Sequence, residues 1–287
     1  MICVAESHAD LDAYARVWTA VHPLSPISGD EVRARLAGRD DGRRYFVAEA
    51  DGRAVGVGFA AAGTSVPGRA GVAVAVLPGH RRRGIGSRLL ETALGHAKSL
   101  GAGHALGSLG QAELPWAERR GFAEVEREVE LVLDLDGEEQ AGEPPPGIRL
   151  VPLDAGRFDE AFALYAQGVG DMPGADDYVV TRDRFAQEVD EAPLVLVALD
   201  GERVVGYAAL ERLTDDVLGH QLTTVARTHR RRGIAGALKR AQVAWAARHG
   251  IRRLVTDTHA DNVATQKLNE RLGYRALPPL VVVRKEL

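Results

Sequence analysis

Hydrophobic and polar positions follow the same plan twice along this chain. Residues 46–58, FVAEADGRAVGVG, place an apolar run on each side of an Asp-Gly pair, and residues 196–208, LVALDGERVVGYA, repeat that arrangement. Two apolar runs joined by Asp-Gly are typical of a β-hairpin. Each half of the chain is therefore predicted to contain such a hairpin.

A strand-to-helix pattern also occurs twice. An apolar run precedes a cluster of three arginines, and apolar residues then recur at helical spacing. This periodicity predicts amphipathic helices that begin after Gly84 and Gly233 and stop at Gly101 and Gly250. Each arginine cluster is thus expected on a loop between a strand and a helix N-terminus.

The spacing of these features indicates a duplicated domain. The letters HRRRGI stand at 80–85 and again at 229–234, 149 positions apart, and Asp51 precedes Asp200 by the same interval. A constant offset over several features is the signature of an internal repeat. The chain is therefore expected to contain two copies of one α/β domain.

A polar segment separates the two copies. Residues 136–147, DGEEQAGEPPPG, include three prolines and predict an extended linker. We expect a first domain over residues 1–136, a linker over 137–147 and a second domain over 148–287.

Composition disfavours a nucleic-acid-binding protein. Of the 287 residues, 45% are hydrophobic and 26% are charged, as in a globular protein with a sizeable core. The formal net charge is −4, with 16 basic and 20 acidic residues up to position 140 and 20 of each beyond it. Neither half has the basic excess of a DNA- or RNA-binding domain. A helix-turn-helix is not expected either, because the duplicated strands leave no helical bundle to hold one.

Cysteine content and hydrophobicity predict where the protein is located and which partners it has. Cys3 is the single cysteine, so no internal disulfide can form, which fits a reducing compartment. No apolar run approaches the roughly 20 residues of a membrane span, and the start lacks a signal-like pattern. We expect a cytoplasmic protein with no membrane partner and no metal site, either monomeric with an internal pseudo-dimer or a homodimer.

The glycine behind each arginine cluster points to an anion site. A helix N-terminus presents unpaired N–H groups and the positive end of its dipole, and glycine lets an anion approach closely. Neither the Walker motif nor the dinucleotide-binding Gly-x-Gly-x-x-Gly motif is present. The alternative to an anion site is that each arginine cluster is simply a solvated basic helix start without a ligand.

Two motifs carry a resemblance to a known family. Arg230-x-x-Gly233-x-Ala235 and Arg81-x-x-Gly84-x-Gly86 fit the Arg/Gln-x-x-Gly-x-Gly/Ala pyrophosphate loop of GNAT-type N-acetyltransferases. The chain resembles bacterial tandem GNAT proteins over nearly its whole length. The resemblance implies two tandem GNAT folds, each a mixed, splayed sheet flanked by helices.

The resemblance also implies acetyl-CoA as cosubstrate. Its pyrophosphate would bind the backbone amides of the loop, and its pantetheine arm would pair with the strand before it. In the second domain the implied residues are Val225, Arg230, Arg231, Arg232, Gly233, Ile234, Ala235 and Gly236. In the first domain they are Val76, Arg81, Arg82, Arg83, Gly84, Ile85 and Gly86.

The first domain lacks the catalytic groups that the family uses. GNAT enzymes often place a Glu base near the strand before the loop and a Tyr acid five residues before a late aromatic residue. Residues 68–76 hold no carboxylate, and Ala117 stands at the tyrosine position, with Trp116 beside it. We therefore expect the first domain to be a degenerate or scaffolding copy.

The second domain is better equipped but also departs from the pattern. Asn269 stands at the tyrosine position, and its amide cannot act as a general acid near neutral pH. His220 and Glu211 are the candidate bases, and alternation places His220 on one face of its strand with Leu222 and Thr224. Further candidates near the site are Asp257, His259 and the terminal carboxylate of Leu287, while Asn262 is expected to cap the late helix.

The acceptor is expected to be a small-molecule amine. Residues 168–192 contain seven acidic residues and two arginines, and an acidic surface would attract a cationic amine. Asp171, Asp176 and Asp177 are the candidates there, against the alternative of ordinary solvated acids. The predicted activity is acetyl transfer from acetyl-CoA to a primary amine by direct attack. A non-catalytic acyl-CoA-binding sensor or scaffold is the alternative.

Overall fold

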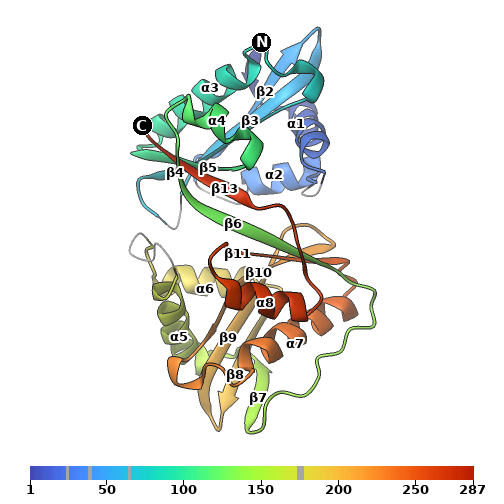
Figure 1. The fold of residues 1–287 in the computed structure, drawn as a ribbon, viewed down its shortest axis with the longest axis vertical. Helices are drawn as coiled ribbons and strands as arrows, with labels where there is room; N and C mark the ends of the chain where they lie inside the picture. Colours follow the sequence, from blue (N-terminus) through green and yellow to red (C-terminus); the bar gives the residue numbers. More distant parts are fainter. Residues whose placement is uncertain (24–25, 38–40, 64–65, 173–177) are drawn as a thin grey trace. The chain divides into compact units, whose positions relative to one another are not determined.

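A computed structural model describes residues 1–287 except 24–25, 38–40, 64–65 and 173–177 (Figure 1). The chain forms two compact α/β units. Unit 1 contains Met1–Glu126 and Val281–Leu287, and unit 2 contains Arg127–Leu280. Within the described residues, no helix combines the length and the apolar character needed to cross a membrane.

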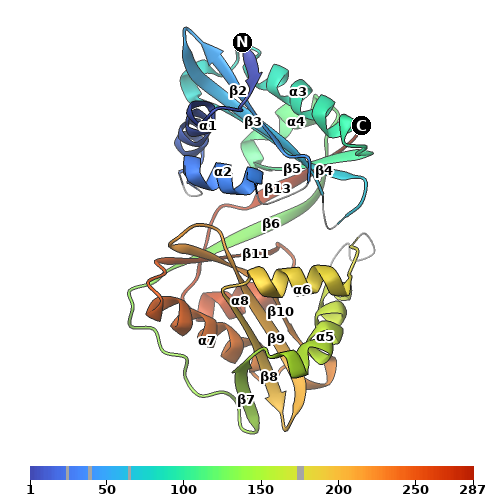
Figure 2. The same cartoon turned by 180° about the vertical axis from the view of Figure 1, so that it is seen from behind.

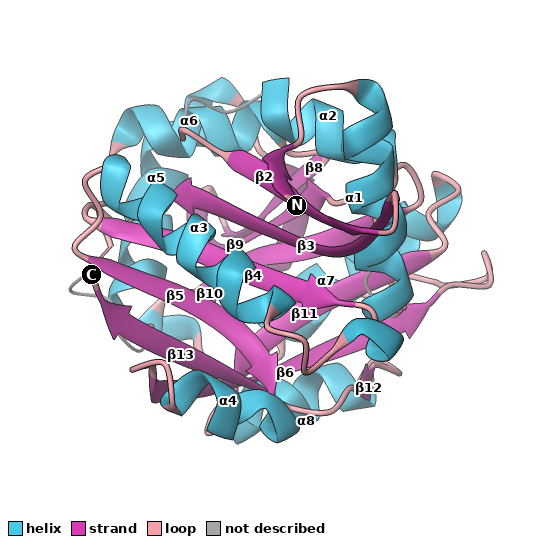
Figure 3. Ribbon diagram, turned by 90° about the horizontal axis from the view of Figure 1, so that it is seen from above, coloured by secondary structure: helices cyan, strands magenta, loops and turns pink. Residues whose placement is uncertain are grey.

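Unit 1 is a sheet with helices on both faces. Its elements are β1 (Ile2–Val4), α1 (His8–Val21), α2 (Gly29–Ala37), β2 (Arg44–Ala50), β3 (Arg53–Ala62), β4 (Arg69–Val76), α3 (Ile85–Ser99), β5 (His104–Gly110), α4 (Leu114–Glu118) and β13 (Leu280–Glu286). The strand order is β1-β2-β3-β4-β5-β13, and Figure 3 shows β2 to β13 in that sequence. β2 and β3 are antiparallel and form the predicted Asp-Gly hairpin.

Two apolar layers hold unit 1 together. Residues such as Tyr14 and Val57 pack between the sheet and helices α1 and α2, and Leu89 and Phe122 belong to the layer under α3 and α4. Figures 1 and 2 show the two helix pairs on opposite faces of this sheet. Burial of the apolar stripe of each helix stabilises the arrangement, as the 3.6-residue periodicity predicts.

Unit 2 repeats the plan. Its elements are β6 (Ala123–Asp134), which begins in unit 1, β7 (Ile148–Pro152), α5 (Phe158–Gly170), α6 (Arg182–Glu191), β8 (Leu194–Asp200), β9 (Arg203–Arg212), β10 (Val217–Val225), α7 (Ile234–Arg248), β11 (Arg253–His259), α8 (Val263–Arg271) and β12 (Arg275–Ala276). The strand order is β6-β11-β10-β9-β8-β7, and β12 pairs with β6. β8 and β9 form the second predicted hairpin.

The two faces of the unit 2 sheet have different apolar layers. Phe185 and Tyr207 belong to the layer under α5 and α6, whereas Ile234 and Leu238 pack α7 against the opposite face. We call these the α5 face and the α7 face. Alternate residues of each strand point to alternate faces, so the face of a side chain decides which site it can enter.

The compact units do not coincide with the predicted domains. β6 belongs to the first half of the sequence, yet it pairs with β11 of unit 2 from Glu128 to Asp134. β13 ends the second half of the sequence, yet it lies beside β5 in unit 1. The limits 1–136, 137–147 and 148–287 therefore describe the repeat in the sequence, while strand pairing groups the residues differently.

Candidate active site

The parting of β10 and β11 marks the candidate site of unit 2. These parallel strands stop pairing at Gly219 and Val255, although they continue to Val225 and His259. We call the remainder of both strands the splay. Backbone N–H and C=O groups that face the splay are no longer paired across it, so an extended ligand arm could bind them.

The loop between β10 and α7 holds the predicted phosphate-binding motif. Arg230 Nε donates a hydrogen bond to the Val225 carbonyl at 3.1 Å, which ties the loop to the end of the strand. Arg231 and Gly233 have left-handed backbone, with φ of 61° and 81°. Helix α7 begins at Ile234, and no side chain caps its N-terminus. The first N–H groups of the helix are therefore available to an anion.

Gly233 leaves room for a ligand at this N-terminus. A Cβ atom built at Gly233 would meet only Pro145 Cγ, at 3.6 Å, among atoms within 4 Å. Any side chain there would also strain the left-handed backbone. The other predicted loop residues are exposed Arg232, half-buried Ala235 and buried Gly236. The residues present therefore fit the pyrophosphate of acetyl-CoA.

The loop of unit 1 has the same backbone. Arg81 Nε donates to the Val76 carbonyl at 3.1 Å, and Arg82 and Gly84 have φ of 60° and 79°. Helix α3 begins at Ile85 without a side-chain cap, and Arg83 is exposed. Identical letters thus give identical loop geometry in both units.

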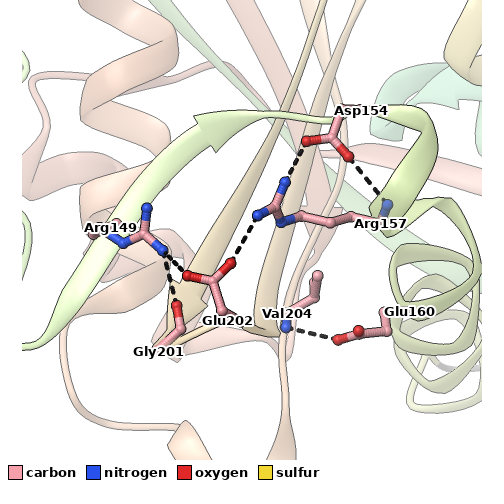
Figure 4. A network of polar contacts seen from close by, with 7 residues as sticks. All are labelled: Arg149, Asp154, Arg157, Glu160, Gly201, Glu202 and Val204. Carbon is pink, nitrogen blue, oxygen red and sulfur yellow. Dashed lines mark hydrogen bonds and ion pairs between the residues drawn. The ribbon is translucent and has the colours of Figure 1, made fainter.

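The hairpin turn at Asp200 supports the loop of unit 2. The Asp200 carboxylate lies 3.3 Å from His229 Nε2 and 3.4 Å from Arg232 Nη1. The turn itself is held from the other side, where Arg149 donates to the Gly201 carbonyl and to Glu202 (Figure 4). Figure 4 shows the remaining contacts of this network, formed by Asp154, Arg157, Glu160, Glu202 and Val204.

Asp171 pairs with arginines of the loop. Its carboxylate accepts hydrogen bonds from Arg227 and Arg230, and these bonds lower the pKa of Asp171 to about 2. The charge of Asp171 is thus balanced within the protein, which leaves less of it to attract a cationic amine. Asp176 and Asp177 lie outside the described residues.

A β-bulge changes which side chains of β10 share a face. His220 lies opposite Leu210 and Thr223 opposite Ala208, so two residues of β10 face the single residue Ala209. Such a bulge shifts the alternation by one position. His220 therefore points to the α7 face, whereas Thr224 contacts the α5 face at Gly168, contrary to the predicted shared face.

His220 is enclosed on the α7 face. It is only 6% exposed, and its Nδ1 and Nε2 lie 3.0 Å from Gln242 Oε1 and 2.5 Å from the Tyr274 hydroxyl. Burial, together with the positive charge of Lys239, holds the pKa of His220 well below its usual range. A neutral imidazole with both nitrogens engaged has no lone pair left for a substrate.

Glu211 occupies the α5 face at the start of the splay. It lies opposite Gly219 on β10, and a Cβ atom at Gly219 would be 3.0 Å from the Glu211 carboxylate. The absence of a side chain at Gly219 therefore lets Glu211 extend across β10. Tyr207 and Ala209, on the same face of β9, belong to the apolar layer under α5 and α6.

A group of polar side chains lies on the α7 face at the start of the splay. We call it the vertex cluster: His220, Lys239, Gln242, Thr256 and Tyr274. Lys239 Nζ lies 3.4 Å from Thr256 Oγ1, and Lys239 is only 3% exposed. The sequence analysis did not identify Lys239. Aligning the two halves pairs it with Leu90, and a charged residue in place of an apolar one is the signal that could have identified it.

Asn269, at the predicted acid position, adjoins this cluster. The Tyr274 N–H donates to the Asn269 carbonyl at 3.1 Å. The Asn269 side chain is fully buried, and its Oδ1 and Nδ2 atoms have no hydrogen-bond partner within the described structure. An unpaired amide of this kind is costly unless a ligand supplies the missing bonds.

The corresponding positions of unit 1 are apolar. The registers and helix starts match Val72 with His220, Leu90 with Lys239 and Ala117 with Asn269. The remaining counterparts are Ala61 for Glu211, Ala93 for Gln242, Gly107 for Thr256 and Phe122 for Tyr274. β4 also keeps an unbroken register with β3, without a bulge.

β4 and β5 also stop pairing at Gly71 and Leu106, but two contacts distinguish this place from its counterpart in unit 2. A Cβ atom at Gly107 would lie 2.8 Å from the Val72 carbonyl oxygen, so β4 and β5 are close where unit 2 accommodates Thr256. Trp116 lies within 3.6 Å of a Cβ atom built at Gly86, above the first turn of α3. Arg120 stacks on Trp116, with 4.1 Å between the guanidinium carbon and the ring centroid.

The other predicted residues have separate roles. Asp257 is exposed and lies opposite Glu130 of β6, where burial and the Asp257 charge raise the pKa of Glu130. His259 Nδ1 accepts from the Asp261 N–H at 3.2 Å. Asn262 caps α8 by accepting from the Thr265 N–H, as predicted.

The chain end is grouped with unit 1. Leu287 belongs to unit 1, and its N–H donates to the Gly103 carbonyl at 2.9 Å. β13 lies beside β5 in the sheet, and the terminal carboxylate as a candidate base of unit 2 stays a prediction. Among the described residues, no group of three or more His, Cys, Asp or Glu side chains could hold a metal ion.

Comparisons with known proteins identify the family. The sequence matches the profile of the Acetyltransferase (GNAT) family twice, over residues 11–122 and 161–274. It is 25% identical over 294 residues to a mycothiol acetyltransferase of Corynebacterium efficiens, covering 97% of this chain and 94% of that one.

Solved structures show the same fold. A GCN5-related N-acetyltransferase from Sphaerobacter thermophilus has a TM-score of 0.80 at 22% identity, covering 99% of this chain and 95% of its own. A tandem GNAT protein from the clavulanic acid biosynthesis pathway has a TM-score of 0.75 at 20% identity, with 100% and 98% covered.

Proposed function

The chain belongs to the acetyltransferase (GNAT) family, and we propose that its unit 2 transfers an acetyl group from acetyl-CoA to a primary amine of a small molecule. The prediction of two tandem GNAT folds and of an N-acetyltransferase is confirmed. The observation that carries the proposal is the loop at Gly233, which presents an uncapped helix N-terminus beside the splay of β10 and β11.

The loop residues support acetyl-CoA as the acetyl donor. Backbone N–H groups from Ile234 to Gly236 would hold the pyrophosphate, and Arg231 and Arg232 would add positive charge. Beyond Gly219, the edge of β10 that faces the splay would pair with the amides of the pantetheine arm. Bound there, acetyl-CoA would supply an activated thioester for transfer.

Glu211 is the base that the geometry favours. Direct attack requires a neutral amine, so a group at the site must accept the ammonium proton. Glu211 lies on the α5 face at the start of the splay, whereas His220 is enclosed on the opposite face with both nitrogens engaged. We therefore assign the proton transfer to Glu211, directly or through water, and a positioning role to His220.

The proposed acceptor is a small-molecule amine. The α5 face carries carboxylates besides Glu211, including Glu188, which accepts a hydrogen bond from Tyr165. An amine related to mycothiol is the first acceptor to test, because the relative from Corynebacterium efficiens is named a mycothiol acetyltransferase. Acetylation in the cytoplasm completes the proposal.

A screen of amines tests this function. Purified protein with acetyl-CoA would be incubated with polyamines, aminoglycosides, amino sugars, amino acids and mycothiol-related amines. Mass spectrometry should detect one acetyl group added to at least one amine. The expected product is absent with free CoA as donor, which serves as the control.

Asn269 favours one alternative function. Its side chain supplies no proton donor of the acidity that a leaving thiolate would use, which fits a non-catalytic acyl-CoA sensor or scaffold. Binding of acetyl-CoA without acetylation of any amine in the panel would support that alternative and contradict the enzyme.

A further inference from the structure

A buried lysine lies at the start of the splay. Lys239 projects from α7, and its Nζ donates a weak hydrogen bond to Thr256 Oγ1 at 3.4 Å. Thr256 is the first residue of β11 beyond the last pairing with β10. Among the described residues Lys239 forms no ion pair, so a buried ammonium has only a hydroxyl and an aromatic ring as partners. Such burial is costly and calls for a further partner.

Unpaired amide atoms accompany this lysine. Lys239 Nζ lies 5.8 Å from the ring centroid of Tyr274, whose N–H is bonded to Asn269. Both polar side-chain atoms of Asn269, and Nε2 of Gln242, are buried without a hydrogen-bond partner. These are independent signs that the vertex cluster is completed by a ligand.

We propose, on the basis of the acetyl transfer proposed above, that Lys239 contacts the sulfur of acetyl-CoA and donates a proton to it as it leaves. Asn269 completes the contact through a hydrogen bond to the thioester or the sulfur. Lys239 is thereby assigned as a catalytic residue, although no catalytic motif marks it in the sequence.

The proton balance of the step is closed. The amine nitrogen forms a bond to the carbonyl carbon, the carbon–sulfur bond breaks, and the sulfur leaves with the electron pair. The ammonium nitrogen loses two protons: Glu211 accepts the first before the attack and passes it to water, and it accepts the second as the carbon–sulfur bond breaks. Lys239 gives one proton to the sulfur, so the reaction releases one proton to solvent overall. Solvent returns both groups to their starting states after product release.

The acidity of Lys239 suits this role. Burial lowers the pKa of Lys239 to about 7, although the charge of Asp257 on β11 opposes that effect. A thiol of the cysteine type has a pKa of about 8.5, so proton transfer to its thiolate is favourable from an ammonium with a pKa near 7 and unfavourable from an ordinary lysine, with a pKa of about 10.4. The other titratable groups that face Lys239 are His220 on β10 and Tyr274 after α8.

Binding of CoA and desulfo-CoA tests the contact without turnover. Calorimetry would compare both compounds in the wild-type protein, in Lys239→Met and in Leu90→Met, the matched change in unit 1. A hydrogen bond to a charged group should make the wild type and Leu90→Met bind CoA about tenfold more tightly than desulfo-CoA. Lys239→Met should bind both with equal affinity.

The binding experiment distinguishes failure of the sulfur contact from failure of the acetyl-CoA site. If Lys239→Met keeps the preference for CoA, the sulfur contact is wrong while the acetyl-CoA site stands. If the wild type binds neither compound, the acetyl-CoA site fails and the assignment of Lys239 fails with it. A melting curve checks that Lys239→Met is folded, and Lys239→Gln provides a second variant if it is not.

The pH dependence of kcat tests the proton transfer. With an amine that the screen identifies, Lys239→Met should lose roughly 10²-fold in kcat with little change in the KM for acetyl-CoA. In the wild type, kcat should fall as the pH rises above about 7 because Lys239 loses its proton, and the variant should lack this fall. An unchanged profile in the variant would refute Lys239 as the acid.

Discussion

The loops of units 1 and 2 have the same geometry, but the residues at the start of the splay differ between the two units. Arg81 and Arg230 make the same hydrogen bond to the end of the preceding strand, and Gly84 and Gly233 have nearly the same left-handed backbone. Behind the loop, unit 2 carries the polar vertex cluster and unit 1 carries apolar residues. The presence of the loop motif is therefore no proof of an active copy, because the proposed chemistry depends on residues that the motif does not contain.

The difference extends to the shape of the sheets. β10 has a bulge after His220, whereas β4 keeps its register with β3 throughout. At Gly107 the strands of unit 1 come so close that even a Cβ atom would clash with a backbone oxygen. We therefore expect unit 1 to act as the degenerate copy and unit 2 to bind acetyl-CoA.

The largest effect should come from the loop glycines. Gly233→Val would strain a left-handed backbone and fill the anion site, so acetyl-CoA should no longer stabilise the protein. A ligand at 100 times its Kd contributes about 2.7 kcal/mol to the native state, and the variant should lose that shift in a melting experiment. Gly84→Val is the matched control, and equal losses in both variants would contradict the distinction between the units.

The next largest effect concerns the base. Glu211→Gln keeps the shape of the side chain but removes the proton acceptor, so kcat should fall by ~10²–10⁴-fold. The KM for acetyl-CoA should stay nearly constant, as steady-state kinetics would show. Asp257→Asn, on the same face of the sheet, should have a smaller effect. The assignment is wrong if Asp257→Asn abolishes turnover while Glu211→Gln leaves it intact.

Stability measurements test the cost of the buried lysine by removing it from unit 2 and by introducing one at the matched position of unit 1. Lys239→Leu removes a poorly paired buried charge, and we expect the free energy of unfolding to rise by ~1–4 kcal/mol. Leu90→Lys places a charge among apolar neighbours and should lower it by several kcal/mol. Urea unfolding would measure both, and a destabilised Lys239→Leu would show that the vertex cluster is primarily structural.

The smallest effect concerns Asp171. Asp171→Asn removes a carboxylate that competes with phosphate for Arg230, so acetyl-CoA should bind up to about fivefold more tightly, within the range of one exposed ion pair. The pKa of Asp171 is lowered to about 2, so its charge, and the stability it contributes, is lost only as the pH falls from about 4 toward 2. Calorimetry between about pH 5 and 8 should therefore show a constant difference. Weaker binding by the variant would indicate that Asp171 orders the loop for its ligand.

The sequence by itself determined the local features. The hairpins follow from Asp-Gly turns, the helices from their 3.6-residue periodicity, and the loops from arginine and glycine at fixed spacing. The cap at Asn262 was predicted for the same reason, since a cap depends on residues three positions apart. The family resemblance was visible because it is carried by such local motifs.

Only the tertiary structure decided which residues share a site. The bulge that turns His220 to the α7 face depends on the pairing of β10 with β9. The placement of β13 in unit 1 depends on contacts between residues far apart in the sequence. Lys239 has the same side chain whether it is solvated or buried, and packing of α7 against β11 decides its acidity. Local chemistry specifies turns and caps, whereas register and burial arise from non-local contacts, and these separate the two copies.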